Sequence, residues 1–472
     1  MPMKMMRKLG LVALVIGLIH GPGCDFGSKK KEIIAEPADS LRPALKIWIV
    51  GAPELEKEIL VRWQAASDQA LKIEHVTPER IATREPFNAD VVIYPGVLLG
   101  DLVQKEAIGR LPTQAISKRL TQSEDPVTNE SSTVSWPVRW RNIATYGGQI
   151  YAVPLGASNL GAVMLGLNPD PFKELDSLLI NSRDLNAPSM ELWTHWLNQA
   201  ETVLAASRED RRKKLEDYLS KISLDEKAWL VDRFLFIAST TNARGRGLFD
   251  LVKMEARLNQ PEFTISARVL SRMAQLFPET IGVEPTNAWD SVVSRTHAAA
   301  SFAIGWPSSV NRPDFKGAVE SSGERAVAAL AWNPVRGLIA SMGKKTRQTA
   351  VSCRFILWLS EPEQREALRT VCSGIELTTE QIDRNSVQGD YRTYQTINSR
   401  DSRVETMELS LRMASANQYR AILADCLVAS IREPDQIGPI MVSCSLKWDQ
   451  LTAELGIETQ RISEEQSLGY RK

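Results

Sequence analysis

The sequence predicts an α/β fold in two lobes, each a mostly parallel sheet flanked by helices. The chain has 472 residues, which is too long for one typical core, so two domains are expected. Near its start, β-prone runs alternate with amphipathic helical patterns, as in parallel sheets covered by helices. Between residues 146 and 168, one apolar run ends in a turn-rich loop and another begins. We interpret this passage as a crossing between two domains, where ligand clefts commonly form.

The N-terminus predicts export. A basic start precedes the apolar run 9–19, which is shorter than the roughly 20 residues that span a bilayer. Small residues before Cys24 resemble a bacterial lipobox, in which the cysteine is lipidated. A plain cleaved signal or an uncleaved anchor stays open, because Gly21 stands where Leu is usual and Pro22 is unusual in this pattern. We expect a signal peptide over 1–24, a polar tether over 25–43, and a location on the periplasmic side of a bacterial membrane, held by a lipid anchor.

The first lobe is expected to start with alternating strands and helices. The expected strands are residues 44–50, 71–76 and 90–95, and a helix with Leu55, Ile59, Leu60 and Trp63 on one face follows the first of them. Ligands bind beyond the carboxyl ends of the strands in such sheets. This rule places Glu54 and Tyr94 near any cleft on this lobe, with a solvent-facing loop position as the alternative for each.

The crossing passage carries a resemblance to a known family. Residues 146–156 read Tyr-Gly-Gly-Gln-Ile-Tyr-Ala-Val-Pro-Leu-Gly, and an apolar run to Asn168 follows. This pattern resembles the hinge signature of family 1 extracellular solute-binding proteins, which are two-lobed receptors, mostly for sugars, of ABC importers. Further segments that resemble the family recur in order along most of the chain. The sequence departs from the family at Met190, where Trp is usual, and at Ala298, where Gly often stands.

The resemblance implies a periplasmic-binding-protein fold with extra C-terminal helices. The lobes would be discontinuous, with residues 44–153 plus 308–350 in the first lobe and 154–307 in the second. Residues 351–472 would form a helical region that packs on the lobes. In this family the lobes close on a small ligand, and the loaded receptor delivers it to the permease subunits of an ABC importer. The resemblance therefore implies a sugar-class ligand, a permease partner and a monomeric receptor that is not an enzyme.

Five candidate ligand contacts lie at or near the two expected crossings. Trp140 precedes the first crossing, and it could stack on a sugar or pack beneath the loop. Ser158 and Asn159 offer hydrogen-bonding groups in the loop itself. Trp306 ends a strand of small residues at the return crossing, and Trp332 ends another strand. An aromatic side chain at the end of a strand suits the C–H face of a sugar, although Trp306 could also cap a core.

The sequence carries no pattern that indicates catalysis or a metal site. Lys plus Arg and Asp plus Glu both number 57, so no basic excess favours nucleic acid. The four His residues show no metal-ligand spacing, and no glycine-rich phosphate loop occurs, so no cofactor is expected. Two alternatives stay open: a lipoprotein enzyme that acts on polysaccharide with two cleft carboxylates, and a scaffold that has lost its ligand.

Cysteine usage leaves the disulfide pattern open. Beyond Cys24, the chain contains Cys353, Cys372, Cys426 and Cys444, without a Cys-x-x-Cys spacing. An exported chain permits one or two disulfides, but the pairing cannot be derived from spacing alone.

Overall fold

The computed structural model describes most of the chain from Pro43 onward. The described residues are 43–82, 87–112, 123–124, 131–132, 138–156, 159–165, 188–241, 247–294, 300–308, 325–332, 337–377, 409 and 411–470. Contacts divide the chain into two units, Met1–Arg42 and Pro43–Lys472, and all described residues belong to the second unit. The expected signal peptide, tether and Cys24 lie outside the described residues, as do Ser158 and Ala298.

Five strands form the first sheet, in the order β2-β1-β3-β12-β8. Their bounds are β1 Leu45–Val50, β2 Leu71–Val76, β3 Val91–Pro95, β8 Ala152–Pro154 and β12 Leu338–Met342. Strand β1 pairs in parallel with β2 and β3, whereas β12 pairs antiparallel with β3 and β8. The three strands predicted at the start of the first lobe are confirmed, and they form the parallel part of the sheet.

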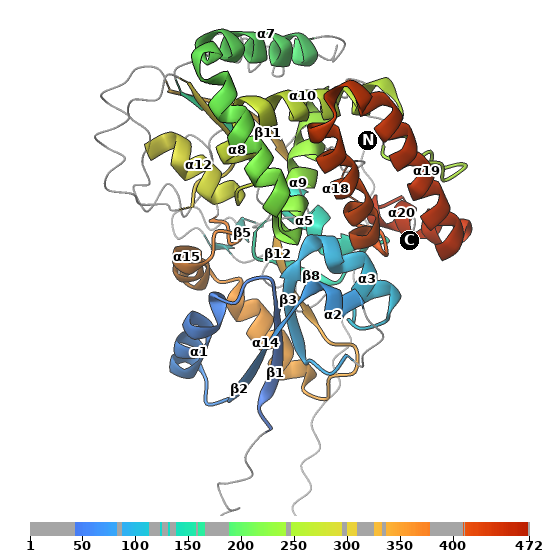
Figure 1. The fold of residues 1–472 in the computed structure, drawn as a ribbon. Coiled ribbons are helices and arrows are strands. Elements are labelled where there is room, and N and C mark those ends of the chain that lie inside the picture. Colours follow the sequence, from blue (N-terminus) through green and yellow to red (C-terminus); the bar gives the residue numbers. More distant parts are fainter. Residues whose placement is uncertain are drawn as a thin grey trace, which may run out of the picture. The chain divides into compact units, whose positions relative to one another are not determined.

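Alternating side chains of these strands enter two different hydrophobic clusters. In β1, Ile47 and Ile49 pack in one cluster, while Trp48 and Val50 pack in the other. The first cluster also contains residues of α1 (Leu55–Ala66), α14 (Thr349–Leu359) and α15 (Pro362–Val371), and the second contains residues of α3 (Leu99–Gln104). Because strand side chains alternate between faces, the sheet is covered by helices on both faces (Figure 1).

A second sheet of three strands has the order β10-β9-β11. Its strands are β9 Asn159–Leu165, β10 Ser301–Gly305 and β11 Arg325–Trp332, and both pairings are antiparallel. The expectation of a mostly parallel sheet in each lobe is therefore wrong for these strands. The physical reason is connectivity: β9 leads the chain away from β8 of the first sheet, whereas β11 leads it back towards β12, so the two run in opposite directions.

Strand β11 also corrects part of the expected lobe bounds. Residues 308–350 were expected in the first lobe, yet β11 hydrogen-bonds to β9 in the second sheet. Only β12, farther along this range, pairs within the first sheet. The division of the chain into two lobes otherwise stays a prediction.

Helices surround the second sheet. They include α7 Pro188–Val203, α8 Arg208–Lys221, α9 Leu224–Thr241, α10 Pro261–Leu276, α11 Pro278–Ile281 and α12 Pro285–Ser294. The ring of Trp196 in α7 lies 4.1 Å from that of Phe302 in β10, so this face of the helix packs in the core. Among the described residues, no helix combines the length and the apolar character needed to cross a bilayer.

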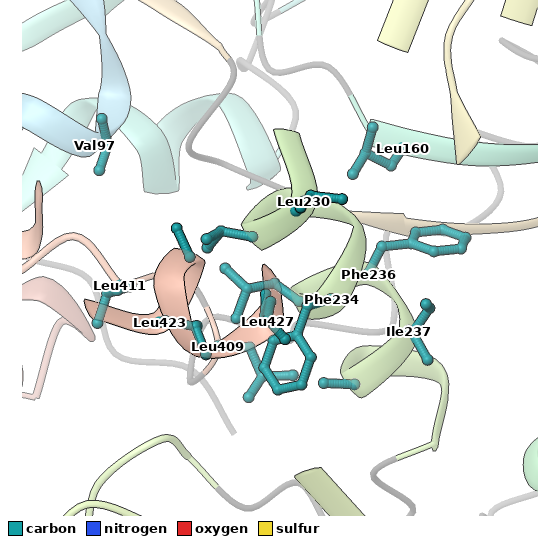
Figure 2. Close-up of a cluster of buried hydrophobic side chains, with 14 of the residues drawn as sticks. Val97, Leu160, Leu230, Phe234, Phe236, Ile237, Leu409, Leu411, Leu423 and Leu427 are labelled. Atoms are coloured by element: carbon teal, nitrogen blue, oxygen red, sulfur yellow. The ribbon is translucent and has the colours of Figure 1, made fainter. Parts of the chain in front are cut away.

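The C-terminal helices also contribute to the core around the second sheet. They are α18 Ala416–Arg432, α19 Ile437–Leu455 and α20 Ile457–Ser467. Figure 2 shows Leu423 and Leu427 of α18 beside Leu230 and Phe234 of α9, in one buried cluster. The C-terminal region is thus divided, because α14 and α15 pack in the cluster on the first sheet and α18 packs with α9 and α10.

Helix α3 lies so close to the backbone of Arg412 and Met413, before α18, that one added methyl group is predicted to destabilise the fold. A Cβ at Gly100 would overlap the carbonyl of Arg412 and lie 2.7 Å from the carbonyl carbon of Met413. We expect Gly100→Ala to lower the free energy of unfolding by about 1–3 kcal/mol, because backbone cannot yield as a flexible side chain does. Urea unfolding measures this change. Gly438→Ala in α19 is the matched control, since a Cβ there meets nothing within 4 Å. Equal stability of both variants would contradict the prediction.

Candidate functional site at the strand crossings

Two passages of the chain connect described strands of the two sheets, and these passages have neighbouring ends. The first passage joins β8 to β9, and the second joins β11 to β12. On the first sheet Pro154 is paired with Ile339, and on the second sheet Asn159 is paired with Trp332. The backbone N–H of Leu155 also donates to the carbonyl of Leu338 at 2.8 Å. The two passages therefore lie between neighbouring strands at both ends: β8 beside β12 on the first sheet, and β9 beside β11 on the second.

A segment that follows α15, residues 372–377, packs directly on the first-sheet end of both passages. The N–H of Glu376 donates to the carbonyl of Leu155 at 3.1 Å. A Cβ at Gly156 would overlap the carbonyl of Gly374 and lie 2.9 Å from the nitrogen of Glu376, so glycine permits this close approach. A Cβ at Gly374 would lie 3.1 Å from the side chain of Leu338.

The buried guanidinium of Arg365 in α15 connects these segments. Its nitrogens donate to the carbonyls of Leu155 at 2.9 Å, Ser360 at 3.0 Å and Glu376 at 3.3 Å, and also to that of Pro154. Burial lowers the pKa of Arg365 to about 9, and the charge of Glu376 opposes this change. Arg365 therefore stays protonated at neutral pH and acts as a fixed donor for backbone carbonyls at the start of the first passage.

Trp140 covers the same guanidinium. The helix α5 (Val138–Ala144) places its ring 4.2 Å from the guanidinium carbon of Arg365, which is a cation–π contact. The indole Nε1 donates to Oε2 of Glu376 at 2.9 Å, and the residue is only 2% exposed. Of the two expectations for Trp140, the structure has the ring packed beneath the crossing. A ligand contact of this ring stays a prediction.

Arg369, also in α15, binds the backbone of the segment just after β10. Its guanidinium donates to the carbonyls of Pro307 at 2.7 Å and Ser308 at 2.5 Å. Ser308 follows Trp306 closely, and its N–H lies 3.4 Å from a carboxylate oxygen of Asp290. Through Arg369, the same helix that binds the first passage also binds the segment after β10.

Trp306 is 5% exposed and belongs to the larger hydrophobic core cluster. Its indole Nε1 has no hydrogen-bond acceptor among the described residues. The preceding Gly305 is required by space, because a Cβ there would overlap the carbonyl of Pro285. An unsatisfied buried donor costs roughly 1–3 kcal/mol, so an acceptor brought to this Nε1 would be stabilising.

Glu54 lies in the exposed turn after β1, and its place beside a ligand cleft stays a prediction. Its carboxylate is hydrogen-bonded to the thiol of Cys372, at the end of α15. Burial, and then the charge of Glu54, raise the pKa of Cys372, so the thiol stays protonated and donates. Arg369 is one turn earlier in the same helix. Glu54 and the segment after β10 therefore both contact the end of α15.

Of the other predicted site residues, one is buried in the core, and two have side chains outside the described part of the structure. Tyr94 is fully buried, and its hydroxyl lies 2.7 Å from Oγ of Ser341 within the first sheet. Its ring faces the core because it alternates with Ile93, which enters the opposite cluster. Asn159 and Trp332 are opposite each other in backbone register, and their side chains are outside the described part. Ligand contacts by these residues stay predictions.

Sequence reasoning missed the residues that hold the crossing together, namely Arg365, Arg369, Cys372 and Glu376. One signal was available. Arg365, Leu368, Arg369 and Cys372 are spaced as on one face of a helix, so the two arginines occupy the buried face. An arginine at an apolar helical position requires buried acceptors. Among the described residues, no cluster of three His, Cys, Asp or Glu could hold a metal ion.

Because backbone carbonyls accept several hydrogen bonds from Arg365, we predict a large loss of stability when its guanidinium is removed. We expect Arg365→Met to lower the free energy of unfolding by about 3–5 kcal/mol, because the buried backbone carbonyls that accept from the guanidinium would lose their donor. Chemical denaturation followed by tryptophan fluorescence measures this loss. Arg212→Met on α8 is the control, because the ion pairs of that arginine with described residues are exposed and should change stability little. A similar response of both variants would show that the Arg365 contacts contribute no more than surface pairs.

Comparisons with known proteins identify the fold. By sequence, the chain matches no protein-family model and no curated protein. By structure, it is similar to an ABC transporter solute-binding protein from Agrobacterium radiobacter K84 in complex with ribitol, with TM-score 0.51 and 13% identity over 87% of this chain and 99% of that chain. A maltose-bound protein of T. maritima and a D-mannitol-bound ABC transporter solute-binding protein from Agrobacterium vitis S4 both reach TM-score 0.49 at 12% identity. They cover 86% and 88% of this chain, and 100% and 99% of their own. We base the assignment on the first: the chain has the α/β fold of periplasmic binding proteins.

Proposed function

We propose that this chain is an extracytoplasmic receptor that closes two lobes on a small sugar or polyol and delivers it to an ABC importer. The observation that carries the proposal is the pair of passages with neighbouring ends, in a fold whose first structural relative holds ribitol. Two strand connections permit the two lobes to rotate relative to each other, while the sheet of each lobe keeps its own hydrogen bonds. Hinge closure of this kind needs changes in only a few backbone angles.

The side chains at the crossings fit a polyhydroxylated ligand. Hydroxyl groups both donate and accept, so they suit the exposed carboxylate of Glu54 and the unpaired Nε1 of Trp306. Ser158, Asn159 and Trp332 are proposed as further contacts, because they flank the passages in the sequence. Trp140 and Tyr94 would support the site from beneath, since both are buried here.

Closure would be a shift between open and closed populations. A ligand can shift this equilibrium only by its difference in affinity for the two forms. Arg365 in α15 binds the backbone at the first-sheet end of the first passage, whereas Arg369 in the same helix binds the segment after β10. In the proposed mechanism Arg365 keeps the end of β8 fixed while the passages themselves bend. The receptor works as a monomer and needs no cofactor.

The proposal predicts that Trp306→Phe weakens binding while the empty protein stays folded. The substitution keeps an aromatic ring and removes Nε1–H, so we expect affinity to fall about tenfold through loss of one hydrogen bond. A thermal-shift screen with ribitol, mannitol and maltose first identifies a ligand, because binding raises the melting temperature. Calorimetric titration then compares wild type and variant.

Trp196→Phe is the matched control for this prediction. Its Nε1 is equally buried and unpaired, but its ring packs on Phe277 and Phe302 beneath α7. Affinity should be unchanged in this variant. If Trp306→Phe binds as tightly as wild type and melts at the same temperature, Trp306 contributes no hydrogen bond to the ligand.

The proposed location predicts a second result. If Cys24 is lipidated, wild-type protein sediments with membranes, and Cys24→Ala is recovered in the soluble fraction. Stable retention requires more than one acyl chain, as bacterial lipoproteins carry. Equal recovery of both proteins with membranes would favour an uncleaved anchor. Equal recovery in the soluble fraction would favour a plain cleaved signal.

A further inference from the structure

Two cysteines face each other between the last long helices. Cys426 in α18 and Cys444 in α19 are 5% and 0% exposed, and their thiols are hydrogen-bonded to each other. The helices are joined by the short helix η5 (Pro434–Gln436), and Tyr419 of α18 packs on Trp448 of α19. Earlier residues of α18 therefore meet later residues of α19, as in an antiparallel hairpin (Figure 1).

The other two described cysteines have different surroundings. Cys353 in α14 is partly buried, and burial alone raises its pKa. The thiol of Cys372 is directed to Glu54 at the end of α15. Four cysteines can form two disulfides in three ways. Among the four described cysteines, the structure shows thiol contact only between Cys426 and Cys444.

The environment of the pair distinguishes the two thiols. The hydrogen bond from Cys444 lowers the pKa of Cys426, and the charge of Lys447 adds to this effect against desolvation. The same hydrogen bond raises the pKa of Cys444, with burial adding to the change. Cys426 is therefore the thiol that more readily becomes a thiolate, which is the nucleophile in thiol–disulfide exchange.

We propose that Cys426 and Cys444 form a disulfide that links α18 to α19 when the chain folds in an oxidising compartment. The proposal depends on the proposed function only through export from the cytoplasm. The Cys426 thiolate attacks one sulfur of an external disulfide oxidant, such as oxidised glutathione, and releases one thiolate of the oxidant. Cys444, deprotonated in turn, attacks the mixed disulfide at Cys426 and releases the second. The protein loses two thiol protons and two electrons, and the oxidant gains both electrons as two thiols.

The hairpin favours this bond kinetically and protects it afterwards. The cysteines are separated by one short helical turn and parts of two helices, so loop closure costs little before the core has formed. In the folded chain, burial excludes external reductants from both sulfurs. The bond would hold α19 in place, where Trp448 stacks on Phe249 at 5.1 Å.

The test uses the mature chain, folded with a mixture of oxidised and reduced glutathione. After denaturation, free thiols are alkylated and the peptides are mapped by mass spectrometry without reduction. We expect the peptides of Cys426 and Cys444 to be linked, while Cys353 and Cys372 carry the alkyl group. Alkylation of all four cysteines, or a link from Cys426 to any other cysteine, would overturn the proposal.

The melting temperature of the wild-type chain, with and without reductant, provides a second measurement. Reduction under conditions that open the chain, followed by refolding with reductant, should lower the melting temperature of wild type by about 3 °C for a loop of this size in a chain of this length. Cys426→Ser should show no effect of reductant, and the control Cys353→Ser should respond as wild type does. A wild-type melting temperature that is insensitive to reductant would contradict the disulfide. Neither result depends on whether a sugar binds.

Discussion

The guanidinium of Arg365, enclosed by backbone carbonyls and the ring of Trp140, is the interaction on which the crossing depends. A buried charge is costly unless its hydrogen bonds are satisfied, and here the carbonyls of Pro154 and Leu155 accept from it at the end of β8. These carbonyls belong to residues that leave the sheet, so they lack a full set of strand partners. The arginine thus satisfies the backbone at the point where the chain departs for the second sheet.

This arrangement connects five parts of the sequence. Arg365 joins α15 to the first passage, Trp140 adds α5 through its bond to Glu376, and Arg369 adds the segment after β10. Glu54 approaches the same helix through Cys372. The fixed part of the proposed hinge is therefore a charged helix face, and the parts that bend in the proposal are the passages beyond it.

Local patterns made much of the fold predictable. The strands β1, β2 and β3 were predicted because alternation and a terminal proline are properties of a few neighbouring residues. The antiparallel second sheet was missed because direction depends on which distant strands pair. Arg365 was missed for the same reason, since Leu155, which it contacts, is 210 positions away. Tyr94 lies in the predicted strand, one residue before its end, but the sequence did not reveal that distant segments cover both faces of this sheet and bury its side chain.

The central claim is that ligand binding closes two bodies about the paired passages. Small-angle X-ray scattering of the mature chain, with and without a saturating concentration of the sugar or polyol that raises its melting temperature, tests this claim most directly. The account predicts a smaller radius of gyration for the bound protein, with each body unchanged internally. An identical scattering profile at saturation would contradict closure and indicate a site that binds its ligand without moving.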